Sequence, residues 1–536
     1  MTTRRALWGL IAVAALVRLF WAGLLGAGND EAYHALYTQH FDWSFYDHPP
    51  MMAVLAALGR LMEPHFGAIF PLRVVFVLLF AGSTFLMARL TERSFGPRAG
   101  WLAAFLLSIA GYYPVAAGSF VLPDGPLLFF WLLTLERFQA ALQSLGSRRG
   151  AIRPWVGVGL AWGCAMLSKY HGVMLPGVLG LTLIALPHAR VWLRRPGPYL
   201  ALVIGMVVFS PVIGWNAAHG WASLGFQAGR AVPGSMLPRP DRLLLGMAAQ
   251  AAYLTPWIWL ALVVALVAGI RAWKQNTAGQ WDRFWLAQPL IPLGLFSVVG
   301  LWRMLLPHWS LVGLLPMIPL AAAELARQIE SSVESQRRVQ ARMVRWACFM
   351  LVGIGVALIQ FQYGLLGRGI SPRFQAQAVT LDPTAELYGW SAVAKELENR
   401  HLLDDPNAFL FTSRWYHSGQ LAFALGDRRP VLCYSPRMSQ GFSVWSRPEQ
   451  WVGHTGILVV LNDNPLEVQM YQRWFESIEP LGEFDVDRGG TSVKHVRLYR
   501  CMNQTKPFPF TGRGSFPRGG GDQATRALAA RDTVQK

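Results

Sequence analysis

The run ALWGLIAVAALVRLFWAGLL, residues 6–25, leads directly into the polar stretch Asn29-Asp30-Glu31-Ala32-Tyr33-His34. A helix that crosses the hydrocarbon core of a membrane needs about 20 apolar residues, which this run supplies. We interpret it as a retained first span, because Arg4-Arg5 precede it but no convincing cleavage site follows. The adjacent carboxylates of Asp30 and Glu31 therefore lie at a membrane boundary, where ionisable residues are candidates for function.

A second polar stretch, FDWSFYDHPPMM, occupies residues 41–52. Its proline pair stiffens the backbone and restricts the residue before it, so we expect Asp47 and His48 to lie in a defined loop. Asp30, His34, Asp47 and His48 are also ligand types for a metal ion, but the pattern lacks a firmly placed third ligand. No cofactor is firmly implied, and a divalent metal is the weaker alternative.

The rest of the chain has the composition of a polytopic membrane protein. Of 536 residues, 53% are apolar and 15% are charged. The fold class that we predict is α-helical, with about 11 transmembrane helices. The run Met51–Met62 is too short to cross a membrane and is predicted to form an amphipathic surface helix. The predicted spans are Ala6–Leu25, Ile69–Leu90, Gly100–Phe120, Pro126–Leu142, Trp155–Leu167, Val173–Leu186, Tyr199–Ile213, Leu245–Ile270, Phe284–Leu301, Leu311–Leu325 and Trp346–Leu366.

The formal net charge of +18 comes largely from short loops between the predicted spans. The arginine-rich loops alternate so that they share one side, which the positive-inside rule assigns to the cytoplasm. An odd number of spans from a cytoplasmic N-terminus places the C-terminus outside. Because topology explains the charge and no RNA-binding motif is present, we do not expect a nucleic-acid partner.

This topology gathers several polar segments on the outer face. Asp124 follows Leu122-Pro123 at a helix entrance, where it is also a good helix cap. Residues 168–172 (SKYHG) interrupt an apolar stretch that would otherwise make a helix of roughly 48 Å, so we expect a hairpin. The hairpin presents cations to the outer interface, although snorkelling of Lys169 to headgroups is an alternative. Four outer arginines oppose the topology bias and suit an anion, with headgroups or carboxylates as alternative partners: Arg230, Arg239, Arg242 and Arg303.

From about Gly369 the composition is that of a soluble domain. Apolar spacing predicts a helix over Glu386–Arg400 and strands near Ala408–Phe411, Pro430–Tyr434, Gly456–Leu461 and Val493–Tyr499. We therefore divide the chain into a membrane domain at 1–368, a small α/β domain at 369–502 and a disordered, Gly/Arg/Pro-rich tail at 503–536. Cys433 and Cys501 either form a disulfide, if this region is extracytoplasmic, or remain free thiols.

These segments resemble the GT-C superfamily of polyprenyl-phosphate-sugar-dependent glycosyltransferases. The resemblance is closest to the bacterial glycosyltransferase family 39 proteins (protein mannosyltransferase-like) and the related lipid A aminoarabinose transferases. It rests on the order of DEAYHALY, YDHPP, LPDGP, SKYHG, WNAAHGWASLGFQ, PHW, DPTAELYGW and RWYHSGQLAFAL, from about residue 29 to 425. It implies the GT-C fold, a bacterial inner membrane location and an extracytoplasmic C-terminal domain.

The resemblance also implies a catalytic site, with Asp30 as general base, Glu31 assisting it and Asp124 as a second acid. His48 stands where the aminoarabinose transferases have a lysine that contacts the donor phosphate. The departure argues against aminoarabinose as the sugar and shifts phosphate binding toward other cations. The predicted donor- and substrate-binding residues are Asp47, His48, Lys169, Tyr170, His171, Arg230, Arg303 and His308.

The implied reaction transfers a sugar from a polyprenyl-phosphate donor to a lipid, glycan or protein acceptor, with inversion at the anomeric carbon. A carboxylate can accept the proton of the attacking group, and cations can stabilise the departing phosphate. A transporter or flippase is the alternative, but it would more usually place ionisable residues near mid-membrane in repeated halves. A scaffold protein is a third class, which gives no reason for acids and cations to converge.

Overall fold

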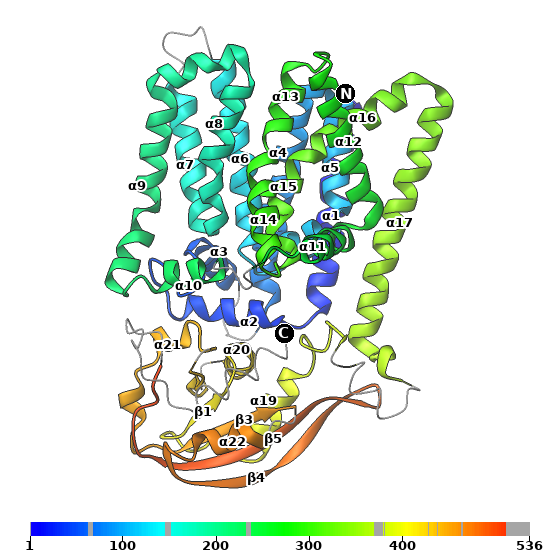
Figure 1. Ribbon diagram of the computed structural model, residues 1–536. Helices are drawn as coiled ribbons and strands as arrows, with labels where there is room; N and C mark the ends of the chain where they lie inside the picture. Colours follow the sequence, from blue (N-terminus) through cyan, green and yellow to red (C-terminus); the bar gives the residue numbers. More distant parts are fainter. Residues whose placement is uncertain are drawn as a thin grey trace.

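The structure is a computed structural model that describes residues 2–62, 68–144, 152–231, 237–368, 379, 381–426, 428–436, 438–462 and 465–510. An upright bundle of helices occupies one end of the molecule, and a smaller domain built on a β-sheet covers the other end (Figure 1). The predicted fold class, a helical membrane bundle with a small C-terminal α/β domain, is confirmed.

Seven helical stretches in the described ranges are long and apolar enough to cross a membrane. Some of the predicted eleven spans are shorter helices, including those at α5 and α8. The helices of the bundle are α1 (Thr2–Leu24), α4 (Phe70–Phe95), α5 (Pro97–Ile109), α6 (Asp124–Gln143), α7 (Ile152–Ser168), α8 (Leu175–Ala185), α9 (Pro196–Ala218), α12 (Pro256–Lys274), α13 (Gln280–Ala287), α14 (Leu290–Trp302), α15 (Leu311–Leu314), α16 (Ile318–Ser331) and α17 (Val333–Tyr363).

The predicted single span over Leu245–Ile270 is wrong, because two helices occupy this part of the chain. α11 (Pro240–Leu254) ends before Thr255, which has a φ of 73°, and α12 starts at Pro256. A proline has no N–H for the helix ladder and disfavours helical backbone in the residue before it. The sequence Thr-Pro therefore ends one helix and begins the next.

Short helices lie between the bundle and the sheet domain (Figure 1): α2 (Asn29–Ala35), α3 (Met51–Arg60) and α10 (Ala222–Ala231). α3 corresponds to the predicted short amphipathic helix. The predicted hairpin is also present, because α7 ends at Ser168, Lys169 is extended and the 3-10 turn η3 (Tyr170–Met174) leads into α8. The break places Lys169 at the end of the bundle that faces the sheet domain.

The C-terminal domain is built on a five-stranded sheet with the order β2-β1-β3-β5-β4. β1 (Phe409–Thr412), β2 (Val431–Cys433) and β3 (Gly456–Leu461) are parallel to one another, and β4 (Phe475–Arg488) and β5 (Thr491–Gln504) complete the sheet as antiparallel strands. Two helices of the domain are α19 (Trp390–Asn399) and α20 (Trp415–Leu425). The four predicted strands are present, whereas β4 was not predicted.

Two expectations for the end of the chain need correction. β5 continues to Gln504, and Phe508 and Phe510 are buried in the core beside Tyr434. The predicted disordered tail therefore does not begin at 503, and residues 511–536 lie outside the described part of the chain. Cys433 and Cys501 are buried free thiols, which agrees with the second of the two alternatives.

The sheet domain is docked on α2 by tight contacts. α20 approaches α2 so closely that a Cβ on Gly419 would lie 3.0 Å from Cβ of Tyr33. The Tyr33 hydroxyl accepts a hydrogen bond from the Gly441 amide at 2.8 Å, and the Gln420 amide donates to the Ala27 carbonyl at 2.8 Å. Tyr33 is fully buried. The domain thus fixes the helix that carries Asp30.

Candidate active site

A cavity of about 580 Å³ lies where the bundle meets the sheet domain. Segments far apart in sequence contribute to its wall, including α2, the loop before α3, the start of α6, the turn at Lys169 and α10. All predicted site residues line the cavity except Glu31 and Arg303. The lining set is Asp30, Asp47, His48, Asp124, Lys169, Tyr170, His171, Arg230 and His308.

Asp30 lies in the first turn of α2. The adjacent Glu31 caps this helix, because its carboxylate accepts the Gly28 amide at 3.0 Å. Asp30 lines the cavity and is exposed to solvent there. In the described part of the chain its carboxylate makes no hydrogen bond or ion pair, so its oxygens are available to a ligand. A positioned carboxylate of this kind can accept a proton from a substrate.

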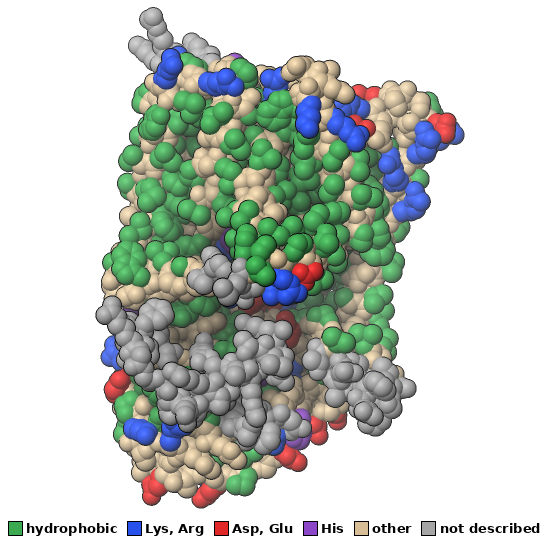
Figure 2. All heavy atoms as spheres, in the orientation of Figure 1, with side chains coloured by type: hydrophobic (Ala, Val, Ile, Leu, Met, Phe, Trp, Pro, Cys, Tyr) green, Lys and Arg blue, Asp and Glu red, His purple; other side chains and the backbone are tan. Residues whose placement is uncertain are grey.

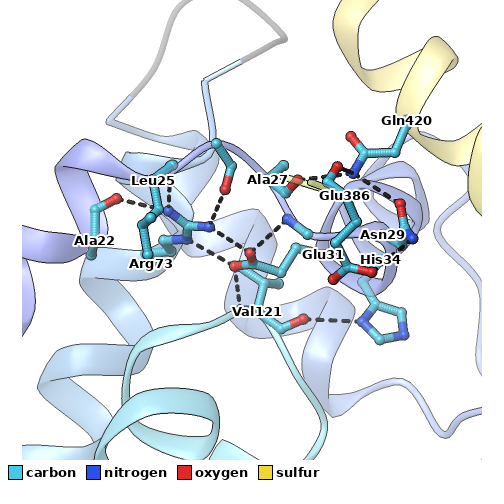
Figure 3. Close-up of polar contacts among 12 residues, drawn as sticks. Ala22, Leu25, Ala27, Asn29, Glu31, His34, Arg73, Val121, Glu386 and Gln420 are labelled. Carbon is cyan, nitrogen blue, oxygen red and sulfur yellow. Dashed lines mark hydrogen bonds and ion pairs between the residues drawn. The ribbon is translucent and has the colours of Figure 1, made fainter. Parts of the chain in front are cut away.

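Glu31 points toward Arg73 (Figure 3) and does not line the cavity. Arg73 donates to both of its carboxylate oxygens, at 2.8 and 2.5 Å, and the Val121 amide donates at 3.0 Å. Glu31 is 1% exposed. These contacts favour a structural role for Glu31 over the predicted assistance to Asp30, which stays a prediction. Its contacts are those of an anchor that holds α2 against α4.

Arg73, at the start of α4, was missed as a site residue by the sequence reasoning. Its guanidinium also donates to the carbonyl of Ala22, in the last turn of α1, and to those of Leu25 and Gly26 just after the helix (Figure 3). Carbonyls at the end of a helix have no partner within it. A signal was available, because an arginine inside the predicted span Ile69–Leu90 needs a partner in a membrane protein.

Lys169 and Asp124 form an ion pair at the cavity wall. The ammonium donates to both Asp124 oxygens, at 2.8 and 2.9 Å, and Lys169 is 6% exposed. An ammonium has three donors, so one remains for a ligand in the cavity. Asp124 is the first residue of α6 and orients the cation. This contact favours a positioning role for Asp124 over the predicted role of second catalytic acid.

Two half-buried histidines in the cavity wall each have one buried ring nitrogen for which the described residues offer no partner. His48 Nδ1 and His171 Nε2 make no hydrogen bond within the described ranges. Burial, followed by the charges of His34 and Lys169, holds the pKa of His48 well below its usual value. His48 is therefore neutral near pH 7 and can exchange hydrogen bonds with a ligand without acting as a fixed cation. Buried polar atoms normally have a partner, so a bound ligand is the natural one.

Asp47 is tied mainly to protein groups. Its carboxylate accepts hydrogen bonds from Tyr37 and, at 3.2 Å, from Tyr33, and its carbonyl accepts the Gln227 amide at 2.7 Å. Burial raises the pKa of Asp47, and the charge of His34 is the largest opposing effect. His34 in turn contacts the Val121 carbonyl through Nδ1 at 3.0 Å. No group of three or more His, Cys, Asp or Glu that could hold a metal ion is found among the described residues.

Aromatic rings surround the remaining polar residues. The Arg230 guanidinium lies over the rings of Phe226, at 4.5 Å, and Trp309, at 5.3 Å. His308 stacks on Tyr112 with a centroid distance of 5.6 Å. The Tyr170 hydroxyl shares a hydrogen bond of 2.5 Å with the Ser223 hydroxyl. Several further polar and aromatic lining residues were not predicted individually. Gln227, Trp309 and Trp415 lie within motifs of the resemblance, whereas Tyr112, Tyr253, Phe296 and Gln440 stand in none of them.

The remaining outer arginines contact protein groups outside the cavity wall. Arg303 donates to the Gly229 carbonyl at 2.7 Å, and Arg242 donates to the Trp302 carbonyl at 2.8 Å. Arg239 pairs with Asp241 at 2.8 Å, which is the carboxylate partner that we gave as an alternative. Of the four outer arginines, Arg230 alone lines the cavity.

Known proteins share parts of this sequence. Residues 47–215 match the family model described as dolichyl-phosphate-mannose-protein mannosyltransferase. The chain is also similar to the lipid A galacturonosyltransferase RgtD of Rhizobium johnstonii, with 26% identity over 279 residues. The matched region covers 49% of this chain and 54% of RgtD, so the chain spans about half the length of this curated relative.

Solved structures share the fold over nearly the whole chain. ArnT from Cupriavidus metallidurans bound to undecaprenyl phosphate superposes with a TM-score of 0.62 and 15% identity, over 93% of this chain and 98% of ArnT. Apo ArnT from the same organism superposes with a TM-score of 0.59 and 16% identity over the same shares. The predicted resemblance is therefore confirmed: the chain has the fold of ArnT, and its residues 47–215 match the dolichyl-phosphate-mannose-protein mannosyltransferase model.

Proposed function

We propose that the protein is a membrane glycosyltransferase that moves a sugar from a polyprenyl-phosphate-linked donor to a lipid, glycan or protein acceptor. The observation that carries this proposal is the Asp30 carboxylate, which has no partner among the described residues. It lies in a cavity that also holds Lys169, Arg230 and two imidazole nitrogens that likewise lack a partner there. RgtD acts on lipid A, and the ArnT structure contains undecaprenyl phosphate. Both names support this donor and acceptor class.

We further propose that the cavity and the sheet domain, from about residue 369, face outward from the bacterial inner membrane. Lys and Arg side chains gather at the end of the bundle that lies opposite the sheet domain (Figure 2). The positive-inside rule assigns such an end to the cytoplasm. A broad belt of hydrophobic side chains separates the two ends and matches the expected position of the bilayer (Figure 2).

In this mechanism the acceptor hydroxyl or amine attacks the anomeric carbon of the donor sugar. Asp30 takes the proton of the attacking group as the new bond to carbon forms. The bond between the anomeric carbon and the phosphate oxygen breaks, and its electron pair leaves with the lipid phosphate. The free donor of Lys169, with Arg230 nearby, stabilises this charge. A single displacement with one base inverts the anomeric carbon.

The alternative of a transporter or flippase fits the structure less well. The ionisable residues of the cavity gather at one end of the bundle, beneath a folded domain that contributes Trp415 and Gln440 to the wall. A transport pathway would be expected to have its substrate site near the middle of the membrane. The similarity to RgtD, a transferase, also favours transfer chemistry.

The test is Asp30→Asn, compared with Asp487→Asn on the exposed edge strand β4 as a matched control. Mass spectrometry of lipids and envelope glycans, with and without the protein, identifies the donor that accumulates. Release of polyprenyl phosphate from that donor is then measured with purified protein. Loss of a general base typically costs a factor of about 10² to 10⁴, so Asp30→Asn should be nearly inactive while the control keeps its turnover. Near-normal turnover by folded, donor-binding Asp30→Asn would remove Asp30 as the base.

A further inference from the structure

A second hollow lies on the flank of the bundle, away from the active-site cavity. α17 stands apart from the other helices over much of its length (Figure 1), and a groove of about 600 Å³ opens between it, α12 and α16. The walls are mostly apolar and include Leu260, Val264 and Leu325. The rings of Trp257 and Phe349, with centroids 4.3 Å apart, bridge α12 and α17. The apolar walls of the groove therefore suit a hydrocarbon chain.

One end of this groove is positively charged. Arg342 and Arg345 line it, and Arg338 borders the adjoining hollow. Arg342 donates to the neutral Gln328 amide oxygen at 2.6 Å, and Arg345 donates to the Ala341 carbonyl of its own helix at 3.3 Å. Within the described ranges neither guanidinium contacts a carboxylate, so both charges remain available to an anion.

The acid nearest to these arginines is already engaged. Glu324 also lines the groove, but Arg327 donates to one of its oxygens at 2.8 Å and Gln328 to the other at 2.9 Å. Arg338 reaches Glu334 at 3.4 Å, where both side chains are exposed to solvent. Exposed pairs of this kind neutralise little charge. The mouth of the groove therefore keeps an excess of positive charge.

The sequence of α17 places this charge at the level of lipid phosphates. The helix is polar and basic from Val333 to Arg345 and apolar from Trp346 to Tyr363. At 1.5 Å per residue the apolar part is roughly 27 Å long, close to the 30 Å of a typical hydrocarbon core. Arg342 and Arg345 then lie at the headgroup boundary, while the apolar walls lie at the depth of acyl chains.

We propose that this groove binds an anionic diacyl phospholipid from the leaflet opposite the active site. Its phosphate lies against Arg342 and Arg345, and an acyl chain follows the apolar walls between α12 and α17. An anionic headgroup is favoured over a zwitterionic one because two arginines lack a carboxylate partner. The lipid also supplies contacts that α17 lacks, since 6% of the apolar part of this helix is buried by protein. Because α17 leads into the sheet domain, lipid binding couples the bilayer to the domain over the cavity.

The test measures binding of dioleoyl-phosphatidylglycerol to the detergent-purified full chain by native mass spectrometry. Arg342→Gln/Arg345→Gln should weaken binding about 10- to 30-fold, because each basic residue near an anionic lipid contributes about 1 kcal/mol. The control is Arg194→Gln/Arg337→Gln, which removes the same charge from exposed positions that do not line the groove. The control should bind within about twofold of the parent protein, as its removed charges lie outside the headgroup site.

A third variant tests the apolar part without changing any charge. Ala261→Trp places an indole in the groove, where it should displace the acyl chain. Binding of phosphatidylglycerol should therefore be lost, although all arginines remain. Equal phosphatidylglycerol affinity in all four proteins would overturn the proposal. Equal binding of dioleoyl-phosphatidylethanolamine would overturn the anionic preference. Tighter binding of undecaprenyl phosphate, abolished by the groove variants, would make this a site for the polyprenyl carrier instead.

Discussion

The buried ion pair of Glu31 with Arg73 and the partly buried pair of Asp124 with Lys169 differ in what they leave unsatisfied. In the pair of Glu31 and Arg73, protein groups engage both carboxylate oxygens and the guanidinium reaches three backbone carbonyls as well (Figure 3). In the pair of Asp124 and Lys169, one ammonium donor remains and the cavity lies beside it.

This difference separates a structural pair from a functional one although both contain the same kinds of groups. A pair whose donors and acceptors are all used by protein can fix helices but has nothing to offer a ligand. A pair with a spare donor beside a cavity can bind an anion and still keep its orientation. Asp30 extends the contrast, because it is adjacent to the saturated Glu31 and yet makes no hydrogen bond within the described part of the chain.

The largest expected effect on stability is at the saturated pair. Glu31→Gln leaves the buried Arg73 without its counter-charge, and breaking a buried pair by removing one partner costs about 3–5 kcal/mol. We expect a large drop in the melting temperature of the detergent-purified protein. Turnover per folded molecule should change far less, because Glu31 does not line the cavity.

The control for this prediction is Glu330→Gln, which removes an exposed carboxylate that pairs with Arg98 at 3.0 Å. Exposed pairs contribute about 0–1 kcal/mol, so the control should melt near the parent protein. If Glu31→Gln instead kept its melting temperature and lost turnover, the saturated pair would belong to the chemistry. The comparison between the two pairs would then fail.

The next effect is on activity, at the unsaturated pair. Lys169→Gln removes the spare donor and the positive charge beside the departing phosphate. Removal of one such contact typically costs a factor of about 10² to 10³ in turnover. Asp124→Asn keeps the cation but loosens its orientation, so it should lose less activity than Lys169→Gln.

Release of polyprenyl phosphate by the two variants, measured per folded molecule, checks this order. Arg303→Gln is the matched control, because its guanidinium donates to the Gly229 carbonyl and does not line the cavity. Equal losses from Lys169→Gln and Arg303→Gln would move the phosphate site away from Lys169. A greater loss from Asp124→Asn than from Lys169→Gln would restore Asp124 as a catalytic acid.

The fold was largely predictable because apolar runs and turn residues act locally. The break between α11 and α12 could have been predicted from Thr255-Pro256. Strand β4 was not predicted because charged and apolar residues alternate in it around Pro480 and Gly482. β4 is an edge strand that pairs only with β5, so exposed charges along it are expected. Its only signal was alternation, which the charges made weak.

The site was predictable only as a set of polar residues on one face. The order of the motifs pointed to Asp30 and Lys169. It could not show which carboxylates accept hydrogen bonds from other protein groups and which remain open to a ligand. That depends on Arg73 and on the Val121 amide, which lie far from Glu31 in sequence. Whether all hydrogen-bonding atoms of a side chain have protein partners depends on tertiary packing, and no local sequence pattern indicates it.

The smallest effect concerns Glu386, which the sheet domain contributes next to α2. Its carboxylate accepts a hydrogen bond from the Asn29 side chain at 2.9 Å (Figure 3). Burial, followed by the carboxylates of Asp30 and Glu31, raises the pKa of Glu386 from 4.5 to about 7, and Lys494 opposes the shift. The folded protein therefore holds this proton more tightly than the unfolded chain between about pH 4.5 and 7. Its stability should fall as the pH rises through that window.

Glu386→Gln cannot ionise, so it should remove this decrease while keeping the shape of the side chain. The difference should be about 1 kcal/mol or less, because Glu386 is partly open to solvent and its charge is screened. Melting temperatures of both proteins at pH 5 and pH 8 provide the measurement, with Glu398→Gln on the exposed face of α19 as the control. The parent protein should lose more stability between the two pH values than Glu386→Gln. The contrary result would be a parent protein that gains stability toward pH 8 relative to Glu386→Gln. The folded protein would then favour the ionised form of Glu386. Nearby cations would outweigh the repulsion that we attribute to the carboxylates of Asp30 and Glu31.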